Sequence, residues 1–79
     1  MQSQRSQLAR VQRAVVLQVL REDHPQWWTR AELERDLEPM ALTGALAKLA
    51  ADDVIQVDDE RVRASRCARH LDALGLIAA

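Results

Sequence analysis

The chain is short, mainly aliphatic and close to neutral, with 79 residues, 48% hydrophobic residues and a formal net charge of −1. A chain of this length buries only about 60–65% of its unfolded surface, and we expect one small domain with no room for a separate effector-sensing or catalytic domain. The polar first residues and the lack of a long apolar run predict neither a signal peptide nor a membrane span. The single cysteine, Cys67, cannot form an internal disulfide. We therefore expect a cytoplasmic protein with no membrane partner.

The charges are segregated along the chain. Residues 1–21 carry +4, residues 22–60 carry −8 and residues 61–79 carry +3. Attraction to a polyanion is therefore expected from the two ends of the chain rather than from its middle.

A first helix is predicted from about Gln7 to Glu22, after a flexible polar tail at residues 1–7. Apolar residues recur at helical spacing along it and fill one broad face. Pro25 disfavours helical geometry in the residue before it, so this helix ends there. His24 is then interpreted as a loop residue.

The start of the second helix has the sharpest local pattern. Thr29 and Glu32 have the spacing of a capping box, in which each side chain binds a free backbone N–H group. Trp28 and Leu33 have the spacing of a hydrophobic staple, and the helix is expected to end near Glu38. Because neighbouring residues of an extended chain point in opposite directions, one of Trp27 and Trp28 is expected in the core. The other is expected on the surface, over a neighbouring side chain.

Two further helices and a hairpin follow. Pro39 suits the first turn of a third helix, and Asp53 after its end is expected in the left-handed conformation. Residues 54–57 and 61–64 alternate as two strands around an acidic turn. Alternation predicts four inward residues on the strands: Ile55, Val57, Val62 and Ala64. Ser65 is predicted to cap a last helix over residues 65–79.

This order of elements resembles the winged helix-turn-helix superfamily, as in small bacterial and archaeal transcription regulators. The resemblance covers about residues 8–64 and depends on residues 28–33, on Leu42, Leu46 and Leu49, and on residues 52–55 before the wing. It implies a mainly α (α+β) fold with a three-helix core, a two-stranded hairpin wing and a C-terminal helix. Many such regulators use an added helix of this kind for dimerisation.

The resemblance implies a role in binding double-stranded DNA. In the family the third helix lies in the major groove and the wing contacts the backbone or minor groove. Mapped onto this chain, Thr43 and Lys48 face the groove, whereas Arg30, Arg61 and Arg63 face phosphates. Six carboxylates lie near these residues in the sequence: Glu38, Asp52, Asp53, Asp58, Asp59 and Glu60. A lone monomer is therefore expected to bind DNA weakly.

An alternative is a non-enzymatic interaction module. Gly44, Ala47, Lys48 and Ala51 form a small-residue face of the third helix on which a helix of a protein partner can dock closely. A homodimer through the first and last helices is expected in either case, because it covers apolar residues that a small monomer need not bury. Its predicted interface consists of five residues: Leu17, Leu71, Leu74, Leu76 and Ile77.

No pattern in the chain indicates catalysis, so we predict a protein that is not an enzyme. Cys67 and His70 lie one helical turn apart, but no second pair has the spacing of metal ligands, and we expect no metal and a small buried thiol. The two glycines form no phosphate-binding loop, and no cofactor is expected.

Overall fold

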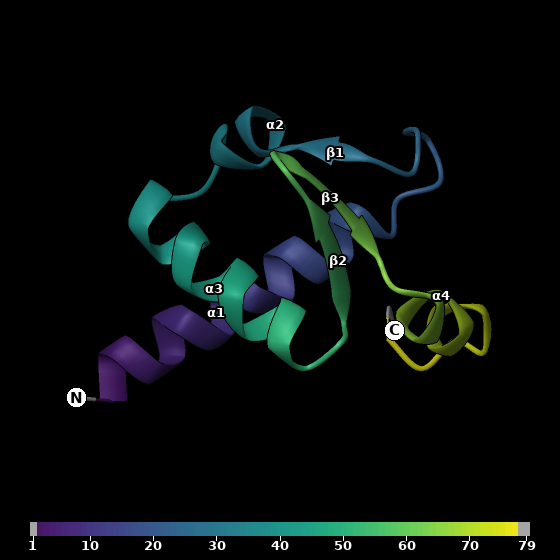
Figure 1. Cartoon of the computed structure of the whole chain (residues 1–79). Coiled ribbons are helices and arrows are strands. Elements are labelled where there is room, and N and C mark those ends of the chain that lie inside the picture. The colour runs from purple at the N-terminus through teal and green to yellow at the C-terminus, as the bar shows by residue number, and fades with distance from the viewer. Residues whose placement is uncertain (1, 78–79) are drawn as a thin grey trace.

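The computed structural model describes residues 2–77, and the side chains of residues 7–77. Within this range the chain forms four helices and a three-stranded antiparallel sheet, an α+β fold that is compatible with a winged helix (Figure 1). The elements in chain order are α1 (Gln2–Val19), β1 (Trp28–Thr29), α2 (Arg30–Glu34), α3 (Pro39–Ala51), β2 (Ile55–Asp58), β3 (Arg61–Ala64) and α4 (Arg66–Ala73). The hairpin β2–β3 separates α3 from α4, so these two helices lie on different sides of it (Figure 1).

Helix α1 starts earlier and ends earlier than predicted. The backbone of residues 2–6, which the sequence predicted as a polar tail, is the first part of α1. Met1, the first residue of that tail, lies outside the described residues. The helix ends at Val19 rather than at Glu22, in a turn where Arg21 N donates to Gln18 O (3.2 Å). Its inward face is made of valines at helical spacing: Val11, Val15 and Val19.

The predicted capping box starts α2. Thr29 Oγ1 accepts from Glu32 N at 3.1 Å, and Glu32 Oε1 accepts from Thr29 N at 2.9 Å. The helix has only five residues and ends at Glu34, short of the predicted Glu38. Glu38 precedes Pro39 and has the extended backbone (φ −66°, ψ 129°) that a following proline favours, so the chain leaves helical geometry before it.

Helix α3 begins at Pro39, as predicted, and buries the predicted apolar face: Leu42, Ala45, Leu46 and Leu49. Asp53 follows the helix with φ 60°, which confirms the predicted left-handed residue. Its N–H donates to Ala50 O (3.1 Å), and Val54 N donates to Leu49 O (2.9 Å). These two bonds form a Schellman motif with aspartate in the place that glycine usually takes.

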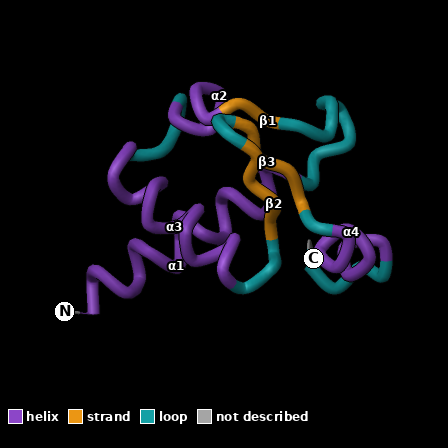
Figure 2. Tube along the Cα trace, in the orientation of Figure 1, coloured by secondary structure: helices purple, strands orange, loops and turns teal. Residues whose placement is uncertain are grey.

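The sheet has three strands rather than the predicted two, in the order β1–β3–β2 (Figure 2). Trp28 pairs with Val62 and Thr29 with Arg61. Strand β1 therefore pairs with the free edge of β3, for which the sequence predicted no partner strand. Ile55, Val62 and Ala64 are buried as predicted. Val57 is 48% exposed, although alternation predicted it inward; it lies on the edge strand β2, whereas its partner Val62 lies on the central strand β3 and is buried.

Helix α4 is capped by Ser65, whose Oγ accepts from Ala68 N at 3.0 Å, as predicted. It ends at Ala73, so the predicted helix over residues 65–79 is too long. Gly75 has φ +77°, its N–H donates to Asp72 O (2.9 Å), and Leu76 N donates to Leu71 O (3.0 Å). This second Schellman motif stops the helix. Residues 78 and 79 of the predicted helix lie outside the described residues.

One core joins the helices to the inner face of the sheet. Leu33, Leu42, Val15 and Val62 are its largest fully buried side chains. Trp28 is also buried, which identifies it as the core tryptophan of the pair. None of the helices in residues 2–77 combines the length and apolar character needed to cross a membrane.

Candidate nucleic-acid interface

The structure brings Arg30 and Thr43 together at the turn between α2 and α3. Arg30 Nε donates to Glu34 Oε1 at 2.7 Å, and its NH2 group donates to Pro39 O at 3.2 Å and to Thr43 Oγ1. Thr43 Oγ1 in turn donates to Pro39 O at 3.0 Å. Both residues were predicted to face DNA, and in the structure they join one hydrogen-bond network that links α2 to α3.

The N-terminus of α3 carries its own anion. Glu38 accepts from Ala41 N at 2.7 Å and from Met40 N at 3.1 Å. These amide hydrogen bonds, that of Ala41 first, lower the pKa of Glu38 below its usual value, so the carboxylate stays charged. A helix N-terminus ordinarily attracts phosphate, and here the Glu38 carboxylate occupies it.

The outward face of α3 is exposed along its whole length, as predicted. It consists of mainly small side chains: Met40, Thr43, Gly44, Ala47, Lys48 and Ala51. Lys48 Nζ lies 3.2 Å from Asp52 Oδ2, one turn further along the helix. Both side chains are more than half exposed, and such a pair contributes about 0–1 kcal/mol, so it exchanges readily for another partner.

Arg61 and Arg63 lie on the outer face of the sheet, over the ring of Trp27. Their guanidinium carbons are 4.7 Å and 4.5 Å from the ring centroid. Trp27, which directly precedes β1, is half-buried rather than exposed, and the two arginine side chains cover its ring. Stacking of this kind is worth about 0.5–1 kcal/mol at an exposed site and keeps both arginines extended over the sheet.

The two wing arginines also bind neighbouring polar groups. An NH2 nitrogen of Arg61 lies 3.2 Å from Asp58 Oδ2, and Arg63 Nε donates to Gln56 Oε1 at 2.6 Å. The register explains both contacts, because Arg61 pairs with Asp58 and Arg63 with Gln56 across the hairpin. Arg63 is thus the predicted cation whose partner here is neutral, whereas Arg30, Lys48 and Arg61 each contact a carboxylate.

The apolar residues predicted for a dimer interface fall into two groups. Four of them are exposed: Leu17, Leu71, Leu74 and Leu76. Ile77 is half-buried and packs against the core of the same chain. Leu74, Leu76 and Ile77 lie beyond the end of α4, so this surface belongs to a capped turn rather than to a continuous helix.

Sequence reasoning missed the environment of His24. Its ring stacks on Trp28 with centroids 3.6 Å apart, and Nε2 lies 2.5 Å from Glu32 Oε2. The partner is eight residues away in sequence, so no local pattern indicated the contact. Cys67 was expected to be buried and is exposed, because it lies on the outward side of α4. Among the described residues, no three histidine, cysteine or acidic side chains gather as metal ligands do.

Comparisons of the chain with protein-family models, with curated proteins and with solved structures give no significant match.

Proposed function

We propose that this chain is a winged helix-turn-helix protein that binds double-stranded DNA and acts in transcription regulation. The observation that supports this most is the arrangement of α2, the turn and α3, followed directly by the β2–β3 hairpin, with the outward face of α3 exposed. In a winged helix this face enters the major groove and the hairpin contacts the backbone. On this proposal Thr43 and Lys48 face the groove, and three arginines face phosphates: Arg30, Arg61 and Arg63.

The charges make the proposed binding weak for one subunit. Three of the candidate cations contact carboxylates of the same surface, so binding DNA requires these ion pairs to open. Glu38 also repels phosphate from the start of α3. A homodimer through the exposed leucines after α4 doubles the number of cations per DNA molecule. It leaves α3 accessible, because α4 lies on the other side of the hairpin (Figure 1).

Fluorescence anisotropy with a labelled mixed-sequence duplex tests this proposal. If three or four phosphates are neutralised, raising the salt from about 50 mM to about 200 mM weakens binding by roughly 40- to 150-fold. Lys48→Glu and Arg63→Glu should each weaken binding and lower the slope against salt by about one. Arg13→Glu changes an exposed arginine of α1 outside the proposed contacts and serves as the control. Absent or salt-insensitive binding overturns the proposal.

The alternative is a protein-docking module that uses the same face of α3. The observation that favours it is the openness of this face, since a Cβ atom added at Gly44 meets no other atom within 4 Å. A partner helix can approach such a surface closely. Ala47→Arg separates the two functions, because a bulky cation on this face blocks a docking helix but does not repel phosphate. If DNA binding is absent and Ala47→Arg abolishes capture of a protein, the docking function replaces the first proposal.

A further inference from the structure

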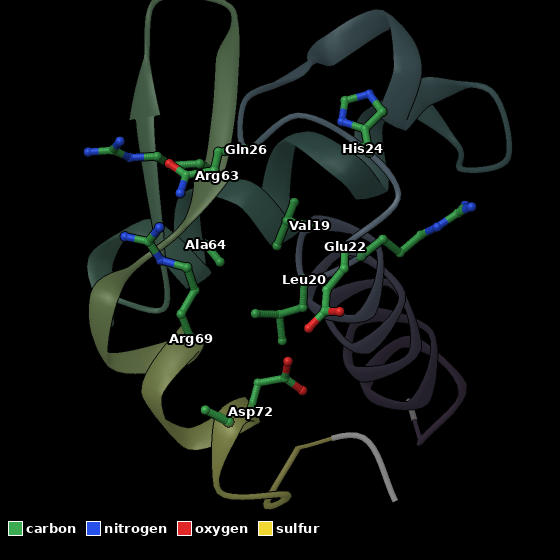
Figure 3. Close-up of a pocket in the computed structure, with 11 residues that line it drawn as sticks. Val19, Leu20, Glu22, His24, Gln26, Arg63, Ala64, Arg69 and Asp72 are labelled. Atoms are coloured by element: carbon green, nitrogen blue, oxygen red, sulfur yellow. The ribbon is translucent and has the colours of Figure 1, made fainter.

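A pocket of about 340 Å³ lies on the other side of the molecule from α3, between the end of α1, the strand β3 and α4 (Figure 3). Its volume falls at the lower end of the range of about 300–1,000 Å³ that ligand sites occupy. Leu20 and Ala64 contribute apolar surface to its walls. The pocket is therefore large enough for a small molecule with an apolar part.

Charged side chains of both signs line this pocket. The carboxylates of Glu22 and Asp72 point toward its interior beside Leu20, as Figure 3 shows. The Arg69 side chain, one helical turn before Asp72 on α4, runs toward Arg63. Arg21 and His24, next to Glu22 in the chain, also line the pocket. The pocket lining therefore combines two carboxylates with several cationic side chains.

These charges do not neutralise one another. Elsewhere on the surface oppositely charged neighbours approach closely, as in the 2.6 Å contact of Arg21 with Asp23. Among residues 7–77, no ion pair within 4.0 Å involves Glu22, Arg69 or Asp72. Arg69 and Asp72 are only three residues apart on α4, a spacing at which exposed ion pairs ordinarily form. The pocket therefore offers unpaired groups of both signs to a ligand.

We propose that this pocket binds a small zwitterion of the free amino-acid class with an apolar side chain. Its carboxylate contacts Arg69, its ammonium group contacts Glu22 and Asp72, and its side chain packs on Leu20. A simple anion is repelled by the two carboxylates, and a simple cation is repelled by Arg69. A molecule that carries both charges satisfies both kinds of group.

Amide chemical shifts of the labelled protein, titrated with L-leucine at constant pH and ionic strength, test this proposal. Saturable shifts are expected at residues around the pocket, including Leu20, Ala64 and Asp72. L-leucinamide lacks the carboxylate, and 4-methylpentanoate lacks the ammonium group. Each should bind at least about tenfold more weakly than L-leucine, because each leaves either Arg69 or the two carboxylates without a partner.

Matched variants separate the pocket from a general effect of charge. Arg69→Gln and Asp72→Asn should each weaken the binding of L-leucine by at least about tenfold, with the dispersed spectrum of the folded protein retained. Arg66→Gln removes an exposed arginine of the same helix that does not line the pocket, and should leave the affinity unchanged. Absence of saturable shifts, equal binding of either analogue, or an equal effect of Arg66→Gln overturns the proposal. Because no DNA is present, the outcome is independent of the DNA-binding test.

Discussion

His24 is held by hydrogen-bond acceptors at both nitrogens of its ring. Nδ1 lies 2.7 Å from Pro25 O, and Nε2 lies 2.5 Å from Glu32 Oε2. Only a doubly protonated imidazole donates at both positions, so this geometry selects the cation. The contact with Glu32 first, and then that with Pro25, raises the pKa of His24 above its ordinary value of 6.5. The cation stacks on Trp28, and His24 thereby fastens the α1–β1 loop to the start of α2.

The stability of the protein should therefore fall as the pH rises above neutrality. A group whose pKa is raised by folding contributes its full stabilisation below its unfolded pKa, here 6.5, and loses it as the pH rises through the raised pKa. Glu32 acts in the opposite direction. Its pKa is lowered, first by the Thr29 amide and then by His24, so its contribution is lost in acid. Urea unfolding at a series of pH values on both sides of 6.5 measures this dependence.

Substitutions assign the pH dependence to His24. His24→Gln should remove most of the fall in the free energy of unfolding above pH 6.5, because glutamine does not titrate. His70→Gln removes the other histidine of the chain, which is exposed on α4, and should leave that fall in place. An unchanged pH profile for His24→Gln would contradict the assignment.

At the scale of elements, the sequence predicted the starts of α2, α3 and α4 well, because capping depends on residues within four positions, whereas α1 starts earlier than predicted. Thr29 with Glu32, Pro39 and Ser65 all lie at the predicted boundaries. The end of α4 also had a local signal in Gly75, which the interpretation of a long last helix overlooked. What the sequence could not predict depends on distant partners. The two-residue strand β1 exists only because it pairs with β3, more than thirty residues further along the chain.

Helix α2 should be sensitive to the loss of its cap. A helix of five residues has almost no intrinsic stability, so its capping box and the burial of Leu33 hold it in place. Thr29→Ala removes the acceptor for Glu32 N and should lower the free energy of unfolding by about 1 kcal/mol, as measured by urea denaturation. Thr29→Ser keeps the acceptor and should retain most of the stability. If both variants were equally destabilised, the lost methyl contact rather than the cap would explain the effect.

At the scale of the whole molecule, the structure keeps the segregation of charge that the sequence shows. The acidic middle of the chain supplies α2, α3 and the hairpin turn, whereas the basic third segment supplies β3 and α4. The sequence predicted which cations are available for the candidate interface, but not their partners. Arg30 bonds to Thr43 on the next helix, and Arg63 bonds to Gln56 across the hairpin. Such contacts require the relative placement of whole elements.

The exposed leucines after α4 should determine the oligomeric state. Leu74 is 59% exposed and Leu76 is 68% exposed, on either side of Gly75 in the turn that ends α4. Burying one leucine contributes about 1.5–3 kcal/mol, so Leu74→Asp should raise the Kd of the dimer by at least about tenfold. Sedimentation at several concentrations measures this shift. Met40→Asp is the matched control, since Met40 is 81% exposed but lies at the start of α3.

Dimer formation should strengthen DNA binding if both subunits contact the same DNA molecule, and Leu74→Asp tests this coupling. If two subunits share one DNA molecule, Leu74→Asp halves the number of cations that each bound complex supplies. Its DNA binding should then be weaker than that of the wild type and should depend less steeply on salt, although no proposed DNA contact has changed. A monomeric Leu74→Asp protein that binds DNA with the affinity and salt slope of the wild type would contradict the proposed dimer. A wild-type protein that sediments as a monomer at every concentration would contradict it as well.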